Sequence, residues 1–171
     1  ITALQPSLPH LKHVVVVGGS GANSFDALLS DPEWEKQPDA QAILTAHRPG
    51  PDDVTQLIYT SGTTGEPKGV MHSANTVMAN IVPYAERLHL GADDVILMAS
   101  PMAHQTGFMY GLIMPILLQA SAVLQDVWEP GKAIALINAE KASFTMASTP
   151  FLTDLARTVT ETGVAVPSLR T

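Results

Sequence analysis

Strand-like and helix-like segments alternate from residue 54 onward, and this alternation restricts the fold more than any other feature of the sequence. The strand-like segments are short and almost wholly apolar, at residues 57–60, 95–99, 122–125 and 144–147. Helical periodicity marks the segments between and after them, at residues 73–90, 105–119, 130–141 and 149–162. Apolar strands separated by helices predict an α/β fold, with a mostly parallel sheet and helices on both of its faces.

Residues 1–53 do not follow this pattern, and we expect them to form a distinct part of the domain. The run "VVVV" at residues 14–17 predicts an edge strand that is buried on both faces. A short helix is predicted at residues 24–29, and a polar, proline-rich connection at residues 30–53 with one short strand at residues 42–45. Residues 54–171 are predicted to form the strand–helix repeat, truncated at its C-terminal end.

A glycine-rich loop follows the strand at residues 57–60, in the sequence "YTSGTTGEPKGV". Its glycines allow backbone N–H groups to approach phosphate oxygens, its hydroxyls add donors and a possible Mg²⁺ ligand, and Lys68 adds one positive charge. A Walker A loop is excluded because Lys68 is followed by Gly69 rather than by Ser or Thr. A solvent-facing turn is the simpler alternative, but this density of glycine and hydroxyl residues favours a nucleoside triphosphate site at a strand's carboxyl end.

The charge balance limits the ligands and partners of the chain. Lys and Arg number 9 and Asp and Glu number 16, so the formal net charge is −7. This argues against a nucleic-acid partner or an anionic membrane surface, and a polyanion would be held mainly by backbone amides, hydroxyls and a metal ion. The chain has no cysteine and no apolar run of the roughly 18 residues that a transmembrane segment needs, so we expect a cytoplasmic protein.

A second motif, "SPMAHQTGFMYG", follows the strand at residues 95–99 and contains His104. Its imidazole can donate a hydrogen bond to an oxyanion, although a lone histidine is more often structural. Gly107 and Gly111 are expected to leave room for a substrate between helix and sheet. Phe108, Tyr110 and Met114 fit either an apolar wall of that site or the core.

A third motif, "ASTP", lies at residues 147–150. Its Thr149 fits either a site residue or a plain helix N-cap. Pro150 is expected at the first helical position, and Gly163 is expected to end the helix.

The two motifs together resemble the adenylate-forming (AMP-binding) superfamily, which includes acyl-CoA ligases, adenylation domains of peptide synthetases, and luciferases. The likeness is to that family's phosphate-binding signature and to its P-x-x-H-x-x-G motif, here at residues 101–107. It implies that His104 lies beside the reacting carboxylate, that Lys68 assists catalysis, and that Thr63 is a candidate Mg²⁺ contact. The implied ATP-binding residues are Thr60, Ser61, Gly62, Thr63, Thr64, Gly65, Glu66, Pro67, Lys68 and Gly69. The implied substrate-binding residues are His104, Gly107, Phe108, Tyr110, Gly111 and Thr149.

In this family a carboxylic acid attacks the α-phosphate of ATP, and a thiol, usually that of coenzyme A, then displaces AMP from the acyl-adenylate. The resemblance covers nearly the whole chain and is to ligases for medium-chain fatty or alicyclic acids such as cyclohexanecarboxylate. We therefore expect a fragment of the large N-terminal domain of an acyl-CoA ligase, unable to complete the reaction alone. A different acceptor, as in carrier-protein or luciferase-like enzymes, and a non-catalytic nucleotide-binding module are the alternatives.

Overall fold

A computed structural model describes residues 4–29, 33, 36–60 and 65–170 of the chain. The chain divides into two compact units, Ile1–Pro49 and Gly50–Thr171. The division thus falls a few residues before the one expected at residues 53 and 54. The second unit contains both motifs.

The first unit contains η1 (Gln5–Ser7), α1 (Phe25–Leu29) and α2 (Ala40–Ala46). The predicted short helix is confirmed as α1, and the Ser24 hydroxyl accepts a hydrogen bond from the Ala27 N–H. The predicted buried strand at residues 14–17 is wrong, because Val16 forms only an isolated bridge and Val17 is 80% exposed. The predicted strand at residues 42–45 is also wrong. The segment "AQAILTA" is helical, since Ala, Gln and Leu are strong helix formers.

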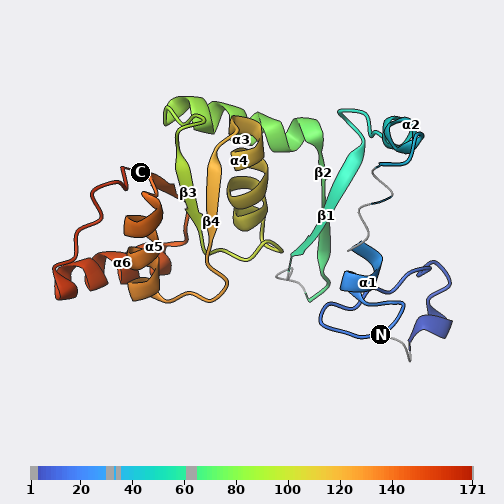
Figure 1. The fold of residues 1–171 in the computed structure, drawn as a ribbon, viewed down its shortest axis with the longest axis horizontal. Coiled ribbons are helices and arrows are strands. Elements are labelled where there is room, and N and C mark those ends of the chain that lie inside the picture. Colours follow the sequence, from blue (N-terminus) through green and yellow to red (C-terminus); the bar gives the residue numbers. More distant parts are fainter. Residues whose placement is uncertain (1–3, 30–32, 34–35, 61–64, 171) are drawn as a thin grey trace. The chain divides into compact units, whose positions relative to one another are not determined.

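The second unit is built around a three-stranded parallel sheet, which confirms the core of the sequence prediction (Figure 1). Its strands are β3 (Val95–Met98), β4 (Ser121–Leu124) and β5 (Phe144–Thr145), in the order β4-β3-β5. β3 is central and pairs in parallel with both neighbours. The chain first moves from β3 to β4 and then back across β3 to β5. Crossover connections between parallel strands are right-handed, and these two connections run in opposite directions along the sheet. Their helices therefore lie on opposite faces of the sheet.

Helices cover both faces of this sheet, as predicted, and two apolar clusters mark the two faces. On one face Ile96 packs with α3 (Ala74–Arg87), the π-helix η3 (Gly107–Ile113) and α4 (Met114–Leu118). On the other face Leu97 packs with α5 (Pro130–Glu140) and α6 (Thr149–Thr162). Ile96 and Leu97 are adjacent and almost fully buried, because successive strand residues point to opposite faces.

The glycine-rich loop connects an antiparallel hairpin, which the sequence reasoning did not predict. β1 (Val54–Thr60) pairs antiparallel with β2 (Lys68–Ser73), and Thr60 lies opposite Lys68. The expectation that this loop leaves a strand of the parallel sheet is therefore wrong. β2 leads directly into α3, whose N-cap is Ser73 in a capping box with Thr76. A glycine-containing loop between two strand-like runs is itself a hairpin signal. The sequence of β2 is short and only Val70 and Met71 in it are apolar, so it was not recognised as a strand.

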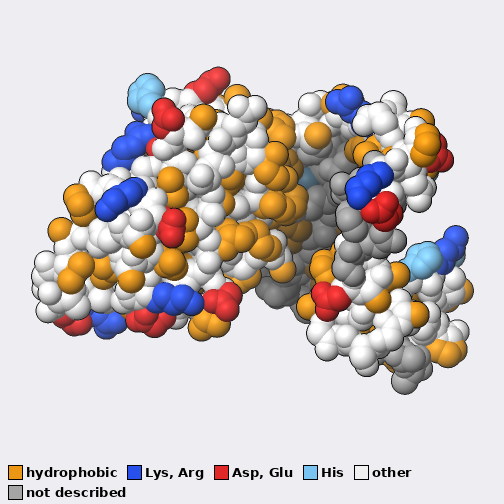
Figure 2. Space-filling model, viewed as in Figure 1, with side chains coloured by type: hydrophobic (Ala, Val, Ile, Leu, Met, Phe, Trp, Pro, Cys, Tyr) orange, Lys and Arg blue, Asp and Glu red, His pale blue; other side chains and the backbone are white. Residues whose placement is uncertain are grey.

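Apolar side chains gather on the outer surface of the second unit over α4 (Figure 2). Ile116 is 68% exposed there and Leu117 is 41% exposed. Exposed apolar patches of this kind usually mark a surface that contacts another segment or another protein. No helix in the described part of the chain is long and apolar enough to cross a membrane.

Candidate functional site

The carboxyl ends of the three parallel strands open onto two neighbouring cavities. The first, of about 250 Å³, lies between the segments that follow β3 and β5, and we call it the His104 cavity. It is lined by Ser100, Pro101, His104, Thr106, Met146, Ala147, Ser148 and Phe151. Residues from the second motif and from the corner that precedes α6 are thus brought together, although Thr149 itself is not in the lining. The lining of this cavity thus combines hydroxyls and an imidazole with apolar side chains.

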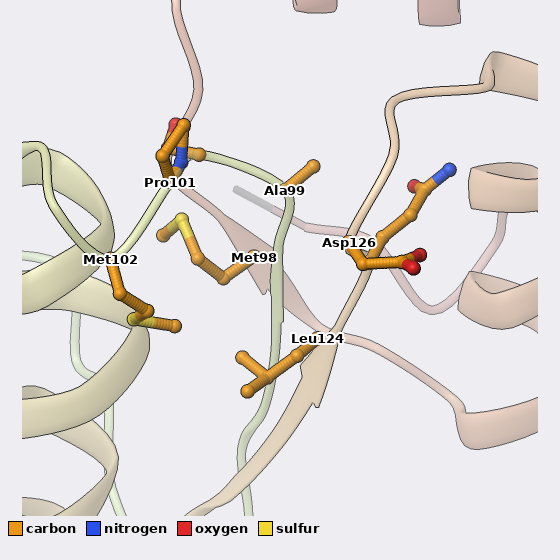
Figure 3. A pocket seen from close by; sticks show the side chains of 8 residues that line it. Met98, Ala99, Pro101, Met102, Leu124 and Asp126 are labelled. Carbon is orange, nitrogen blue, oxygen red and sulfur yellow. The ribbon is translucent and has the colours of Figure 1, made fainter. Parts of the chain in front are cut away.

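The second cavity, of about 310 Å³, lies where β3 and β4 end and shares Ser100 and Pro101 with the first. The side chains of Met98, Met102 and Leu124 turn toward one another there (Figure 3). Asp126 also contributes to the lining, and hydrogen bonds from the Val127 N–H and its own N–H, followed by the nearby Lys132 charge, lower its pKa. This cavity is therefore mainly apolar with one ionised carboxylate.

His104 is held in a defined orientation by the backbone of its own turn. Its N–H donates to the carbonyl of Pro101 at 2.9 Å, and its carbonyl accepts from the N–H of Phe108 at 3.1 Å. The ring atom Nδ1 accepts a hydrogen bond from the N–H of Thr106 at 3.2 Å. A backbone N–H can donate only to an unprotonated ring nitrogen, so the neutral ring carries its proton on Nε2. His104 is exposed, and Nε2–H is thus available as a donor to a ligand.

Gly107 and Gly111 allow close packing of the helix against the sheet, and the space that we expected at these positions is filled by protein. A Cβ at Gly107 would lie 2.2 Å from the carbonyl oxygen of Pro101. A Cβ at Gly111 would lie 2.5 Å from Cγ of Met98. Both glycines fall in the π-helical segment η3, and π-helical turns are frequent at functional sites. Their assignment to substrate binding stays a prediction.

The aromatic residues of the second motif pack toward the core. Met114 is fully buried in the cluster that contains Ile96, so the choice between wall and core is resolved as core for this residue. Phe108 and Tyr110 pack against the same cluster and are half-buried. Burial raises the pKa of Tyr110, with a smaller rise from Tyr84, and the Tyr110 hydroxyl donates to Asn80 at 2.7 Å. Contact of Phe108 and Tyr110 with a substrate stays a prediction.

The described residues of the glycine-rich loop are accessible to solvent. Four of the predicted ATP-binding residues lie outside the described residues, namely Ser61, Gly62, Thr63 and Thr64. The Thr60 hydroxyl donates to the carbonyl of Lys68 at 3.5 Å, and Gly65 has a φ of 91°, which favours glycine. Glu66, Pro67, Lys68 and Gly69 are exposed. The Lys68 ammonium is therefore positioned at the end of the hairpin, within reach of a ligand in solution.

Thr149 is the first residue of α6, and Ser148 is the N-cap, so the predicted N-cap was one residue too late. Pro150 is the second residue of the helix rather than the first, whereas Gly163 ends the helix with a φ of 69°, as predicted. The Ser148 side chain makes no capping hydrogen bond, and Ser148 lines the His104 cavity. Its hydroxyl is thus another donor available to a ligand.

Sequence reasoning missed several residues of the His104 cavity, including Thr106, Met146, Ser148 and Phe151. The position of Thr106 two residues after His104, and of Ser148 directly before the predicted helix, could have indicated the two polar ones. Gln105 was missed as well, and both of its amide atoms are buried without a hydrogen-bond partner among the described residues. Within the same residues, no group of three or more His, Cys, Asp or Glu side chains is arranged to hold a metal ion.

Comparisons with known proteins identify the family of this chain. The sequence profile of the AMP-binding enzyme family matches residues 1–171. Medium-chain fatty-acid–CoA ligase of Escherichia coli (strain K12) is 32% identical over 170 residues, which are 99% of this chain and 29% of that ligase. Benzoate–CoA ligase of Thauera aromatica is 34% identical over 120 residues, which are 68% of this chain and 21% of that ligase.

A solved structure of O-succinylbenzoate coenzyme A synthetase from Bacillus subtilis, in complex with ATP and magnesium ion, has the same fold. The TM-score is 0.64 at 28% identity, over 71% of this chain and 25% of that chain. The chain thus spans less than a third of the length of each of these three proteins.

Proposed function

Because the chain belongs to the AMP-binding enzyme family, we propose that the protein activates a carboxylic acid with ATP and transfers the acyl group to coenzyme A. In the first step a carboxylate oxygen forms a bond to the α-phosphorus, and the bond from that phosphorus to pyrophosphate breaks. In the second step the thiol of coenzyme A attacks the acyl carbonyl and AMP leaves. The observation that carries this proposal is the Nε2–H donor of His104 beside a cavity at the carboxyl ends of a parallel sheet.

His104 would stabilise the charge that develops during the first step. Its Nδ1 is occupied by the Thr106 N–H, so the ring can donate from Nε2 without taking up a proton. A donor aimed at a developing oxyanion lowers the barrier because it interacts more strongly with the transition state than with the substrate. The hydroxyl of Ser148, which lines the same cavity, would add a second donor.

The hairpin loop at residues 60–69 would bind the phosphates of ATP. Exposed backbone around Gly65 and the Lys68 ammonium fit a polyanionic ligand, and Thr63 is the proposed Mg²⁺ contact. Magnesium, when bound, would neutralise phosphate charge and favour departure of pyrophosphate. The described residues contain no cluster of acidic or histidine ligands, which fits an ion that binds mainly through the nucleotide.

The proposed substrate is a fatty or alicyclic carboxylic acid. The lining of the His104 cavity includes Met146 and Phe151, which offer apolar contacts. Ligases for a medium-chain fatty acid and for benzoate are both similar to this chain, which supports an acid with a hydrocarbon body.

The test is acid-dependent exchange between ATP and labelled pyrophosphate by the full-length protein, with octanoate, cyclohexanecarboxylate and benzoate. We expect His104→Ala to lower the exchange rate about 100-fold, as for loss of one oxyanion donor. His89→Ala is the matched control, because His89 is an exposed histidine at the amino-end edge of the same sheet. Equal rates in the two variants, or exchange that no acid stimulates, would contradict the proposal.

A further inference from the structure

An aromatic stack joins the connection between β4 and α5 to the first turn of α6. The rings of Trp128 and Phe151 are almost parallel, with an interplanar angle of 6° and centroids 4.5 Å apart. The indole N–H of Trp128 donates to Oδ2 of Asp154 at 3.2 Å, and Oδ1 of Asp154 accepts from Arg157 at 2.9 Å. Trp128 is therefore fixed both by its ring and by its polar edge.

The two rings have different surroundings. Trp128 packs against the apolar cluster of Leu97, α5 and α6. Phe151 lines the His104 cavity together with Met146 and belongs to neither apolar cluster. Trp128 thus connects the rigid core to a ring that borders the cavity.

We propose that Trp128 is a positioning residue, which fixes Phe151 as the wall against which the hydrocarbon part of the acid binds. This inference rests on the proposed function. A phenylalanine ring at a helix start has several rotamers, and only a neighbour packed against it selects one of them. The stack supplies that neighbour, and the bond to Asp154 prevents the indole from turning away. Trp128 acts on the acid only through Phe151, because it does not line the cavity itself.

Steady-state kinetics of the full-length protein separate this role from a general structural one. We expect Trp128→Ala to raise KM for the acid about threefold to tenfold, as for loss of an aromatic pair, while KM for ATP changes less than twofold. Trp128→Phe keeps a ring beside Phe151 and should restore most of the affinity for the acid.

Leu155→Ala is the structural control, since Leu155 is buried in the same cluster on α6 and does not line the cavity. It should lower the unfolding midpoint and leave KM for the acid unchanged. The inference is overturned if Leu155→Ala reproduces the rise in KM, or if Trp128→Ala shifts the KM values for acid and ATP equally.

Fluorescence gives a second readout that does not depend on turnover. A background of the full-length protein in which Trp34 and every other tryptophan except Trp128 is replaced by Phe isolates the emission of Trp128. Saturating octanoate with ATP should shift or quench this emission, and an unchanged spectrum would overturn the inference.

The outcomes also separate this inference from the proposed function. Wild-type protein without acid-dependent exchange would count against the proposed function alone. Normal exchange with an unchanged KM in Trp128→Ala would count against the present inference alone.

Discussion

The two edges of the parallel sheet differ in how their polar groups are used. At the amino ends of the strands, Asp94 is buried, with 6% of its surface exposed. It accepts hydrogen bonds from Ser143 and from Arg170 at 2.6 Å each, and from the Gly91 N–H at 2.8 Å. This network links Asp94, directly before β3, to Ser143, directly before β5, and to Arg170. At the carboxyl ends, His104 is exposed beside a cavity.

One edge is thus filled by a buried hydrogen-bond network, while the other keeps an exposed imidazole beside a cavity. In open parallel sheets ligands bind outside the carboxyl ends of the strands, and the exposed His104 lies at that edge here. Changes at the amino-end edge should therefore affect stability without affecting chemistry. Packing changes under the carboxyl-end edge should affect both.

The largest effect on stability is expected from Gly107→Ala at the carboxyl-end edge. A methyl group there would lie 2.2 Å from the Pro101 oxygen, so η3 and the turn that carries His104 must move apart. We expect a loss of about 3 kcal/mol in the free energy of unfolding, together with lower exchange activity. Urea unfolding of the full-length protein measures the first. Gly91→Ala is the control, since its added Cβ would have no neighbour within 4 Å. Equal stability of the two variants would contradict the packing role of Gly107.

A smaller effect is expected from Asp94→Ala at the amino-end edge. The substitution leaves Ser143 and the Gly91 N–H without their acceptor, and the cost is about 2 kcal/mol because Arg170 remains half-exposed to water. Hydrogen exchange of the β3 amides reports this loss locally. The exchange of ATP with pyrophosphate should stay within twofold of wild type. A large fall in that rate at a temperature where the variant is folded would show that the two edges are not independent.

The smallest effect is a pH dependence that the same carboxylate contributes. Burial of Asp94 acts to raise its pKa, but hydrogen bonds from Ser143, Gly91 and Arg170, with the charge of Arg170, leave the pKa below its ordinary value. A lowered pKa in the folded state adds stability that is complete above the unfolded value of about 4 and is lost as the pH falls through the folded value. The difference in stability between wild type and Asp94→Asn should therefore shrink below about pH 4. A difference that is constant from pH 7 to pH 3 would contradict this assignment.

The sequence was sufficient for the parts of the fold that depend on local pattern. β3, β4, α5 and α6 lie close to their predicted positions, because apolar runs and helix-boundary residues act over a few neighbours. The run at residues 14–17 was misread for the opposite reason. Its residues have high strand propensity, but strand formation also needs a partner, and Val16 forms only a single bridge.

The candidate site could be located from the sequence, but its geometry could be predicted only in part. His104 stood out because its motif follows a predicted strand, and it does line a cavity. The close approach of Gly107 to Pro101 and the stack of Phe151 on Trp128 depend on how separate segments meet in space. No periodicity or short motif encodes such contacts, so they became visible only in the structure.

The most direct measurement is a crystal structure of the full-length protein with a stable acyl-adenylate analogue. The central claim is that the open edge of the sheet is where the acid is activated. We predict that the acyl-phosphate mimic lies in the His104 cavity within hydrogen-bond distance of Nε2, with its hydrocarbon part against Phe151. An analogue bound elsewhere, with the His104 cavity empty, would contradict the account.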